Sequence, residues 1–293
     1  MVMWPSLLSP KGDARIDLWI APPGAIREAS LLACYARLLS ADEQARWQRF
    51  HFESDRHRYL VTRALVRTNL SAYAPVSPEA WQFTQNSHGR PRIDAPGAAW
   101  ADLDFNVSHT DDLVVCAVVR GRTVGVDVET IDRRELEFEQ LASRFFSARE
   151  SADLLRLPAS GRRERFLEVW TLKEAYVKAR GLGLSLPLDG FSYAFPGTTS
   201  LTLNVHPPGD GAGSWSLWLF RPSASHVLAM CASASTEDHR DPRCFNVVPL
   251  LGHERLGCHP IRWGSSGVRT EASLYPTTER RYSTSTPGGL GSS

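Results

Sequence analysis

Two carboxylates in the segment GVDVE, residues 125–129, have the spacing of a metal-binding pair. Alternate side chains of a strand share a face, so Asp127 and Glu129 point to one face and the valines between them to the other. The rise of a strand places these carboxylates about 7 Å apart. Like charges at this distance repel unless a cation lies between them, and oxygen ligands favour Mg²⁺ over Zn²⁺. A hairpin with one solvated face explains the pattern equally well.

A second chemical motif lies in the segment WTLKEAYVK, residues 170–178, which has a helical pattern. Glu174 and Lys178 are four residues apart, so both project from one helix face. Lysine occurs only at positions 11, 173 and 178, although the chain contains many arginines. A compact ammonium can approach a phosphate or a proton-transfer centre where a guanidinium cannot. The competing interpretation is a surface ion pair worth a few tenths of a kcal/mol.

Three further segments place polar groups at turns or strand ends. Ser108 and His109 end an alternating segment, where they form either a binding group or a simple polar cap. Arg90 follows a glycine turn, which presents its guanidinium on a stiff loop suited to phosphate. Ser147 and Glu150 have the S-x-x-E spacing of a helix capping box. Glu150 is therefore either a catalytic carboxylate or only part of a helix start.

These motifs need elements that position them, and the first part of the chain supplies a strand, helices and more strands. Ser40 and Glu43 have the spacing of a capping box. A helix at 54–70 carries a stripe of basic residues that we interpret as a solvated face. The patterns also predict a strand at 15–20, helical structure over 26–73, a turn at 86–89 and strands at 102–110 and 113–119. A turn at 120–122 predicts that 123–129 is the hairpin partner of 113–119.

The second part of the chain repeats this order. The patterns predict helices at 135–157 and 161–180, the latter ended by Gly181 and Gly183. The segments FSYAF, SLTLNV, SWSLWLF and HVLAMCA are typical of a closing set of antiparallel strands. We therefore expect an α+β protein of two similar halves, at 1–121 and 122–235. Residues 236–293 lack periodic apolar segments, so we expect a disordered tail outside the fold.

Composition excludes several classes of protein. The 293 residues are 42% hydrophobic and 22% charged, which is too apolar for a wholly disordered chain. The formal net charge of +1 provides no global field for nucleic acid or an anionic membrane. No apolar run approaches the roughly 20 residues of a membrane helix, and the N-terminal segment lacks the order of a signal peptide. Five cysteines without a CxxC pair favour a reduced, cytoplasmic location.

Taken together, the motifs resemble a known family. The segments that carry the resemblance occur in register over about residues 15–235: FNVSHT, GVDVE, RFFSARE and WTLKEAYVKARGLGLSLPL, with NSHGRPRI and the helix pair at 40–67. This set closely resembles the 4′-phosphopantetheinyl transferases of the surfactin-synthetase-activating (Sfp-type) group. The resemblance implies two pseudo-symmetric α+β halves, with coenzyme A bound in the cleft between them.

The resemblance also implies a reaction and a metal. The phosphopantetheine arm of coenzyme A moves to a serine of an apo acyl or peptidyl carrier protein, and adenosine 3′,5′-bisphosphate leaves. Asp127, Glu129 and Glu174 would hold Mg²⁺ against the pyrophosphate, where the metal neutralises developing charge. Lys178 would lie near the phosphates or the attacking serine. The serine proton would pass to a water on the metal, to Glu174 or to Glu150.

The remaining roles implied by the resemblance concern the nucleotide. Arg58, Arg90, Ser108 and His109 would hold the 3′-phospho-ADP portion of coenzyme A. Two basic positions of the family fall on Glu43 and Arg46, of which only Arg46 keeps the charge. One chain supplies both sides of the cleft, so we expect a monomer.

Two other functions compete with this one. The first is a binding module that recognises carrier proteins or nucleotides without chemistry. The second is a metal-dependent phosphotransferase on a free nucleotide, which the lack of a G-x-x-x-x-G-K-[ST] loop disfavours.

Overall fold

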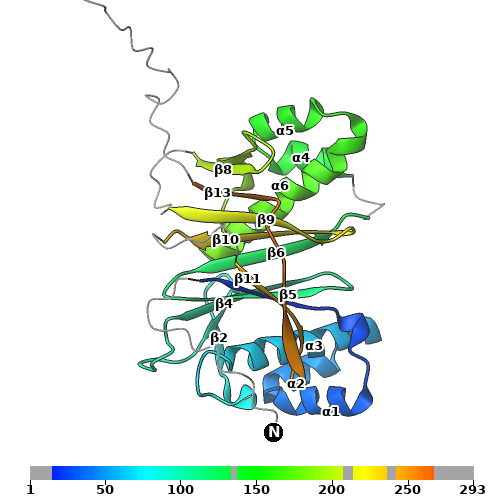
Figure 1. Ribbon diagram of the computed structural model, residues 1–293, viewed down its shortest axis with the longest axis vertical. Coiled ribbons are helices and arrows are strands. Elements are labelled where there is room, and N and C mark those ends of the chain that lie inside the picture. Colours follow the sequence, from blue (N-terminus) through cyan, green and yellow to red (C-terminus); the bar gives the residue numbers. More distant parts are fainter. Residues whose placement is uncertain (1–14, 133–136, 207–213, 236–241, 267–293) are drawn as a thin grey trace, which may run out of the picture.

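The computed structural model describes residues 15–132, 137–206, 214–235 and 242–266, and these form four layers (Figure 1). Two β-sheets face each other, and three helices cover the outer face of each. The lower helices in the figure are α1 (Ala29–Leu38), α2 (Ala41–Gln48) and α3 (Glu53–Leu70). The upper helices are α4 (Phe138–Phe145), α5 (Ala148–Leu155) and α6 (Ala159–Arg180). In the described residues, no helix is both long and apolar enough to span a membrane.

The strands form two main sheets and one separate hairpin. The five-stranded sheet has the order β12 (Gly252–Leu256), β11 (Arg243–Val248), β1 (Asp17–Ala21), β5 (Val114–Arg120) and β4 (Leu103–His109). The six-stranded sheet has the order β6 (Val124–Thr130), β10 (His226–Ser233), β9 (Trp215–Ser223), β13 (Arg262–Ser266), β8 (Ser200–Val205) and β7 (Phe191–Ala194). The hairpin pairs β2 (Phe83–Gln85) with β3 (Pro91–Ile93). Short 3₁₀ turns occupy Pro23–Ala25, Pro78–Ala80, Gly183–Ser185 and Leu188–Gly190.

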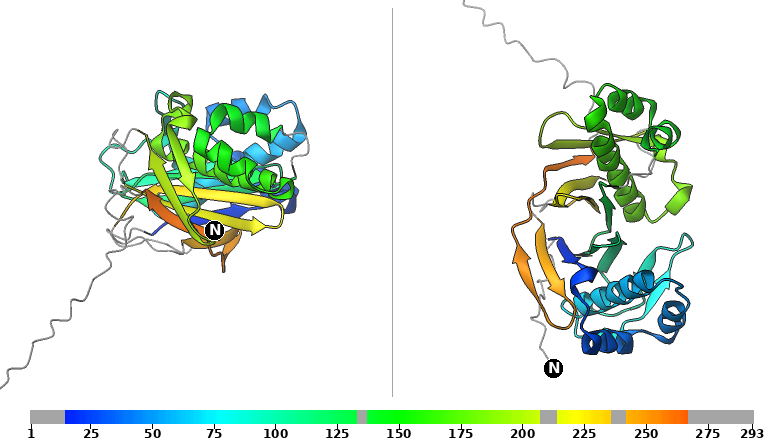
Figure 2. Two further views of the ribbon diagram at one scale, coloured as in Figure 1. Left: turned by 90° about the horizontal axis from the view of Figure 1, so that it is seen from above. Right: turned by 90° about the vertical axis from the view of Figure 1, so that its right-hand side faces the viewer.

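The order of elements repeats, which confirms the expected α+β fold of two similar halves. Each half runs through one strand, three helices, a short hairpin and a longer hairpin. In the first half β5 pairs antiparallel with both β1 and β4, and in the second β10 pairs antiparallel with both β6 and β9. The side view in Figure 2 shows the two sheets back to back with helices outside.

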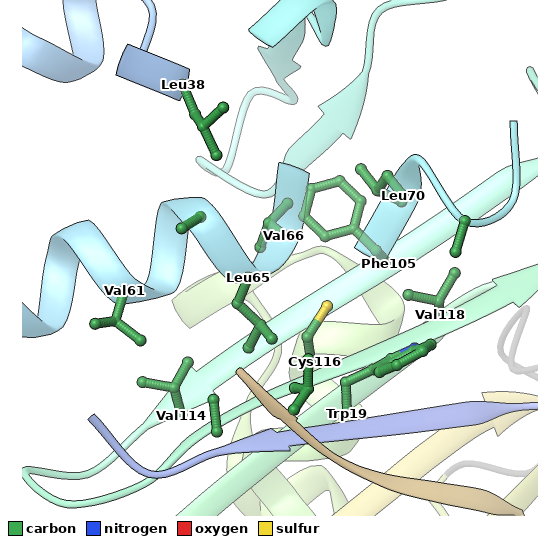
Figure 3. Close-up of a cluster of buried hydrophobic side chains, with 14 of the residues drawn as sticks. Trp19, Leu38, Val61, Leu65, Val66, Leu70, Phe105, Val114, Cys116 and Val118 are labelled. Atoms are coloured by element: carbon green, nitrogen blue, oxygen red, sulfur yellow. The ribbon is translucent and has the colours of Figure 1, made fainter. Parts of the chain in front are cut away.

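Three hydrophobic clusters hold the layers together. Figure 3 shows the first, in which residues of α3 such as Leu65 and Val66 pack on Trp19, Val114 and Cys116 of the five-stranded sheet. A second cluster joins α4–α6 to the six-stranded sheet. The third lies between the sheets and includes the three alternating valines of β6, Val124, Val126 and Val128. The period-two prediction for this strand is therefore correct.

Local signals in the sequence explain where the helices begin and end. Ser40 and Glu43 form the predicted capping box of α2, and Ser147 and Glu150 form that of α5. Helix α6 ends at Gly181, whose φ of 64° is a left-handed conformation that glycine adopts without strain.

Two predictions about the first half are wrong. The segment 123–129 is not the hairpin partner of β5, because β1 and β4 already occupy both edges of β5. The chain instead crosses at residues 121–123 into the other sheet, where β6 pairs with β10. The basic stripe of α3 is not uniformly solvated either. The side chain of Arg67 is only 1% exposed, and it pairs with Glu43 of α2.

The expectation of a disordered tail at 236–293 is also wrong for residues 242–266. This segment, which we call the C-terminal strap, forms β11 and β12 on the five-stranded sheet and β13 in the six-stranded sheet. Strand β11 pairs parallel with β1, while β13 lies between β9 and β8. Arg243 also makes two hydrogen bonds to the buried carboxylate of Asp17, at 2.5 and 2.8 Å. The rest of the expected tail, 236–241 and 267–293, lies outside the described residues.

Candidate active site

The two halves meet along a seam between the edge strands β4 and β6. Alternate polar side chains of β4 point across this seam and replace a backbone ladder. Each accepts a hydrogen bond from a backbone N–H of β6, in the pairs Asp104–Val124 at 2.9 Å, Asn106–Val126 at 2.9 Å and Ser108–Val128 at 3.4 Å. The seam therefore satisfies the outward N–H groups of β6, which would otherwise be buried without acceptors.

Helix α6 lies directly on β6, and Gly125 makes this approach possible. A Cβ atom at this position would lie 2.1 Å from the carbonyl oxygen of Ala175 and 2.4 Å from the backbone nitrogen of Ala179. Only glycine fits this backbone contact. As a result, the side chains of Glu174 and Lys178 on α6 face Asp127 on β6.

Asp127, Lys178 and Ser108 form a connected polar cluster at the seam. The Lys178 ammonium donates to Oδ1 of Asp127 at 2.6 Å and to the Ser108 hydroxyl at 3.0 Å. The Ser108 hydroxyl donates to the same Asp127 oxygen at 2.9 Å. Lys178 on α6 is therefore the ion-pair partner of Asp127 on β6. Its ammonium is held by Asp127 and Ser108.

The carboxylates at this site have unusual surroundings. Oδ2 of Asp127 is buried and has no hydrogen-bond partner in the described structure. Burial raises the pKa of Glu174, the negative charge of Asp127 raises it further, and Lys178 opposes both. Glu129 lies two residues beyond Asp127 and is half-buried. Across the described residues, no three His, Cys, Asp or Glu side chains are gathered into a ready metal cluster.

A cavity of about 440 Å³ opens beside this cluster. Its walls come from both halves: the β2–β3 turn and β4 on one side, α6 and the segment after it on the other. The polar side chains on these walls are those of His88, Arg90, Asn106, Glu174 and Lys178. The cavity thus combines two cationic side chains, a carboxylate and a mostly apolar lining that includes Phe145 and Val177.

Arg90 lines the cavity, but its guanidinium is fully engaged within the protein. Nη1 donates to the carbonyl oxygens of Lys178 and Ala179 at 2.6 Å each. Nη2 donates to Asp104 at 2.5 Å and to the carbonyl oxygen of Val124 at 2.8 Å. Arg90 therefore joins the end of α6 to the seam, and its expected role as a phosphate ligand does not match these contacts.

Glu150 does not belong to this site, so its expected catalytic role is wrong. Its carboxylate caps α5, accepts from the Tyr193 backbone N–H at 2.8 Å and pairs with Lys173 at 2.9 Å. Both side chains of the Glu150–Lys173 pair are at most 1% exposed. A carboxylate enclosed in this way cannot reach a substrate, and the capping alternative holds. Lys173, one of the three lysines, is thus structural.

The other expected nucleotide ligands, His109, Arg58 and Arg46, are not among the residues that line the 440 Å³ cavity. Partial desolvation lowers the pKa of His109, and the positive charges of Arg58 and Lys178 lower it further, so all three lie within electrostatic reach of one another. Arg58 pairs with Asp55 and with Asp111, the latter at 2.6 Å, and borders a second cavity. Arg46 is exposed on α2, with its guanidinium 5.7 Å from the centre of the Tyr59 ring.

Asp104 and Asn106 belong to the seam beside the site but were not predicted from the sequence. The sequence does contain a pattern that could have indicated them: Asp104, Asn106 and Ser108 alternate with apolar residues along one strand. It was not decisive, because a polar face of this kind is equally typical of a solvent-exposed edge.

Comparisons with known proteins agree with this two-halved site. The profile described as "4'-phosphopantetheinyl transferase, N-terminal" matches residues 28–120, and that described as "4'-phosphopantetheinyl transferase superfamily" matches residues 123–231. The first profile ends and the second begins at the point where the chain crosses from β5 to β6. Together they define the class of the protein as a transferase.

The curated relatives place the chain within that class. It is 35% identical over 218 residues to the 4'-phosphopantetheinyl transferase HetI of Nostoc sp. (strain PCC 7120 / SAG 25.82 / UTEX 2576), which covers 74% of this chain and 87% of HetI. It is 34% identical over 219 residues to psf-1 of Bacillus pumilus (73% and 88% covered) and over 159 residues to Sfp of Bacillus subtilis strain 168 (54% and 67% covered). The chain belongs to the 4′-phosphopantetheinyl transferase family, which confirms the resemblance read from its motifs.

Proposed function

We propose that this protein transfers the 4′-phosphopantetheine arm of coenzyme A to a serine of an apo acyl or peptidyl carrier protein. The observation that carries the proposal is the Asp127–Lys178 pair beside Glu174, at the edge of a cavity built by both halves. This arrangement places a cation and two carboxylates where a pyrophosphate can enter.

We propose Mg²⁺ as the metal of this site. The partnerless Oδ2 atom of Asp127 supports this, because a buried carboxylate oxygen without a donor is suited to a cation. The raised pKa of Glu174 supports it as well, since a cation between Glu174 and Asp127 would remove their repulsion. Asp127, Glu174 and Glu129 would hold the ion, whose oxygen-only ligand set favours Mg²⁺. When bound, the metal would neutralise charge on the pyrophosphate as it breaks.

Side chains of the protein supply the other groups that the transfer requires. Lys178 presents a compact positive charge, held in place by Asp127 and Ser108, to the phosphate that is transferred. With the cation bound, Glu174 is ionised at the edge of the cavity, where its carboxylate can accept the proton of the attacking serine. Glu150 is not a candidate for this step.

We place the nucleotide portion of coenzyme A in the 440 Å³ cavity. The guanidinium groups of Arg58 and Arg46 supply the positive charge that a 3′-phosphate requires. His109, whose pKa is lowered, offers the phosphate a hydrogen bond from a neutral ring. Ser108 and Arg90 act indirectly, Ser108 by holding Lys178 and Arg90 by fixing the end of α6 against the seam. We further propose a cytoplasmic monomer, since one chain supplies both walls of the cavity.

The test is to mix the protein with an apo carrier protein, coenzyme A and Mg²⁺, and to weigh the carrier by mass spectrometry. The carrier should gain one phosphopantetheine, and a carrier whose acceptor serine is replaced by alanine should gain nothing. Asp127→Asn should abolish the gain and also weaken Mg²⁺ binding measured by calorimetry. Carrier and coenzyme A binding without any mass gain would instead support the binding-module alternative. Mass gain on a free nucleotide would support the phosphotransferase.

A further inference from the structure

The C-terminal strap carries two of the five cysteines of the chain. Cys244 lies in β11, and Cys258 lies in the connection between β12 and β13. This connection leads from the five-stranded sheet to the six-stranded sheet, so both thiols lie where the strap passes from one half to the other.

The register of the strap brings these two side chains together. Cys244 is paired directly with Leu256 of β12, and Cys258 follows two residues later. Cys258 lies just past the end of β12, where the chain still runs beside the start of β11. The Cys244 sulfur lies 3.7 Å from the carbonyl oxygen of Cys258 and 3.8 Å from that of Pro242, so the two cysteines are direct neighbours. A Cβ added at Gly257, between Leu256 and Cys258, would meet no atom within 4 Å, so no neighbour crowds this side of the connection.

The two thiols differ in exposure and in acidity. Cys244 is 1% exposed, whereas Cys258 is half-buried. The hydrogen bond from Cys244 lowers the pKa of the Cys258 thiol, burial opposes this, and the adjacent His259 lowers the pKa further. In Cys116 and Cys231 burial is the dominant cause, and it raises the pKa of the thiol, to about 12 for Cys116. Cys258 is therefore more accessible than Cys244, and its thiol is more acidic than an ordinary one, with a second cysteine beside it.

We propose that Cys258 and Cys244 are a reversible peroxide-sensitive dithiol, with Cys258 as the attacking thiol and Cys244 as the resolving thiol. The Cys258 thiolate attacks one oxygen of hydrogen peroxide, the O–O bond breaks, and a sulfenic acid forms while the leaving oxygen takes up a proton as water. The Cys244 sulfur then attacks the sulfenic sulfur, an S–S bond forms, and the S–O bond breaks with release of a second water. Two thiols are oxidised and one peroxide is reduced to two waters.

The disulfide would tie β11 directly to the connection that leads into β13. It closes a loop with a sequence separation of 14 residues, which reduces the freedom of the unfolded chain. We therefore expect the melting temperature to rise by about 5 °C on oxidation and to return on reduction.

The experiment treats the full-length protein with hydrogen peroxide at near-stoichiometric amounts, then denatures it and alkylates the remaining thiols. Intact mass should show two fewer alkylated thiols, and a digest should contain a single cross-link between Cys244 and Cys258. Dithiothreitol should restore both thiols. In Cys244→Ser, dimedone should trap the sulfenic acid at Cys258, because the resolving thiol is missing.

Cys34 provides the matched control. It is half-buried like Cys258, but its recorded partner is the guanidinium of Arg37 at 2.9 Å, not a thiol. Cys34→Ser should leave the cross-link unchanged, and Cys258→Ser should abolish it with no loss of melting temperature in reducing buffer. The proposal is overturned if Cys244 and Cys258 both remain alkylated after peroxide treatment. It is equally overturned if Cys34 reacts as fast as Cys258 or if the cross-links join separate molecules.

Discussion

Replacing Gly125 by alanine tests whether the contact between α6 and β6 positions the active site. The added Cβ would lie 2.1 Å from the Ala175 carbonyl oxygen, whereas ordinary contacts begin at 3.4 Å. Because the obstructing atoms are backbone, the helix must retreat by about 1 Å. Overpacking of this kind costs about 1–3 kcal/mol of stability. A displacement of about 1 Å between catalytic groups costs on the order of 10²-fold in rate.

The assay measures transfer of phosphopantetheine to an apo carrier together with the melting temperature. We expect Gly125→Ala to remain folded, to melt several degrees lower and to lose about 10²-fold in turnover. Gly161→Ala is the matched control. Gly161 lies in α6, the helix that packs on Gly125, and a Cβ added to Gly161 would have nothing within 4 Å. That change should stabilise the helix by about 0.5–1 kcal/mol and leave turnover intact. Turnover of Gly125→Ala within a factor of two of wild type would refute the reasoning.

Three further predictions follow from the same geometry. Lys178→Arg should lose about 10²-fold in turnover, since the bulkier fork cannot occupy the site beside Asp127, and an unchanged rate would reject the requirement for a compact charge. The raised pKa of Glu174 means that its contribution to stability falls as the pH rises above 4.5 through the shifted pKa. In Mg²⁺-free buffer Glu174→Gln should therefore raise the melting temperature more at about pH 8 than at about pH 5, and an equal gain at both would contradict the shift. A chain ending at Ser235 should melt about 10 °C lower than one ending at Ser266, because it lacks the C-terminal strap, and equal melting would show that the strap adds nothing.

The fold of the two halves could be predicted because its signals are local. Capping boxes at Ser40 and Ser147, the stop at Gly181 and the alternation around Val126 each act over a few residues. The C-terminal strap could not be predicted in this way. Strand β13 has the sequence RWGSS, with no apolar face, and its backbone hydrogen bonds to β8 and β9 hold it in place.

The candidate site shows the same division between local and long-range information. Asp127, Glu174 and Lys178 were predictable from residue type and spacing, and the structure brings them together. Arg90 was assigned from its place after a glycine turn, and the roles of Arg90 and Glu150 were implied by the family resemblance. Both have internal partners more than forty residues away in sequence, such as Lys178 for Arg90 and Tyr193 for Glu150. No periodicity encodes a partner at that distance, so spacing could not distinguish these structural ions from catalytic ones.

The position of β1 between β5 and β11 has a consequence for how the protein is made. The ribosome makes β1 before every other strand and β11 only after β10, and the ion-pair partner of Asp17 lies 226 residues further along the chain. Until Arg243 emerges, one edge of β1 is open and the carboxylate of Asp17 lacks its ion pair with that arginine. The first half therefore cannot complete its sheet until the C-terminal strap has been made. A chain that stops before the strap keeps an open edge on β1, and an exposed strand edge of this kind is prone to aggregation.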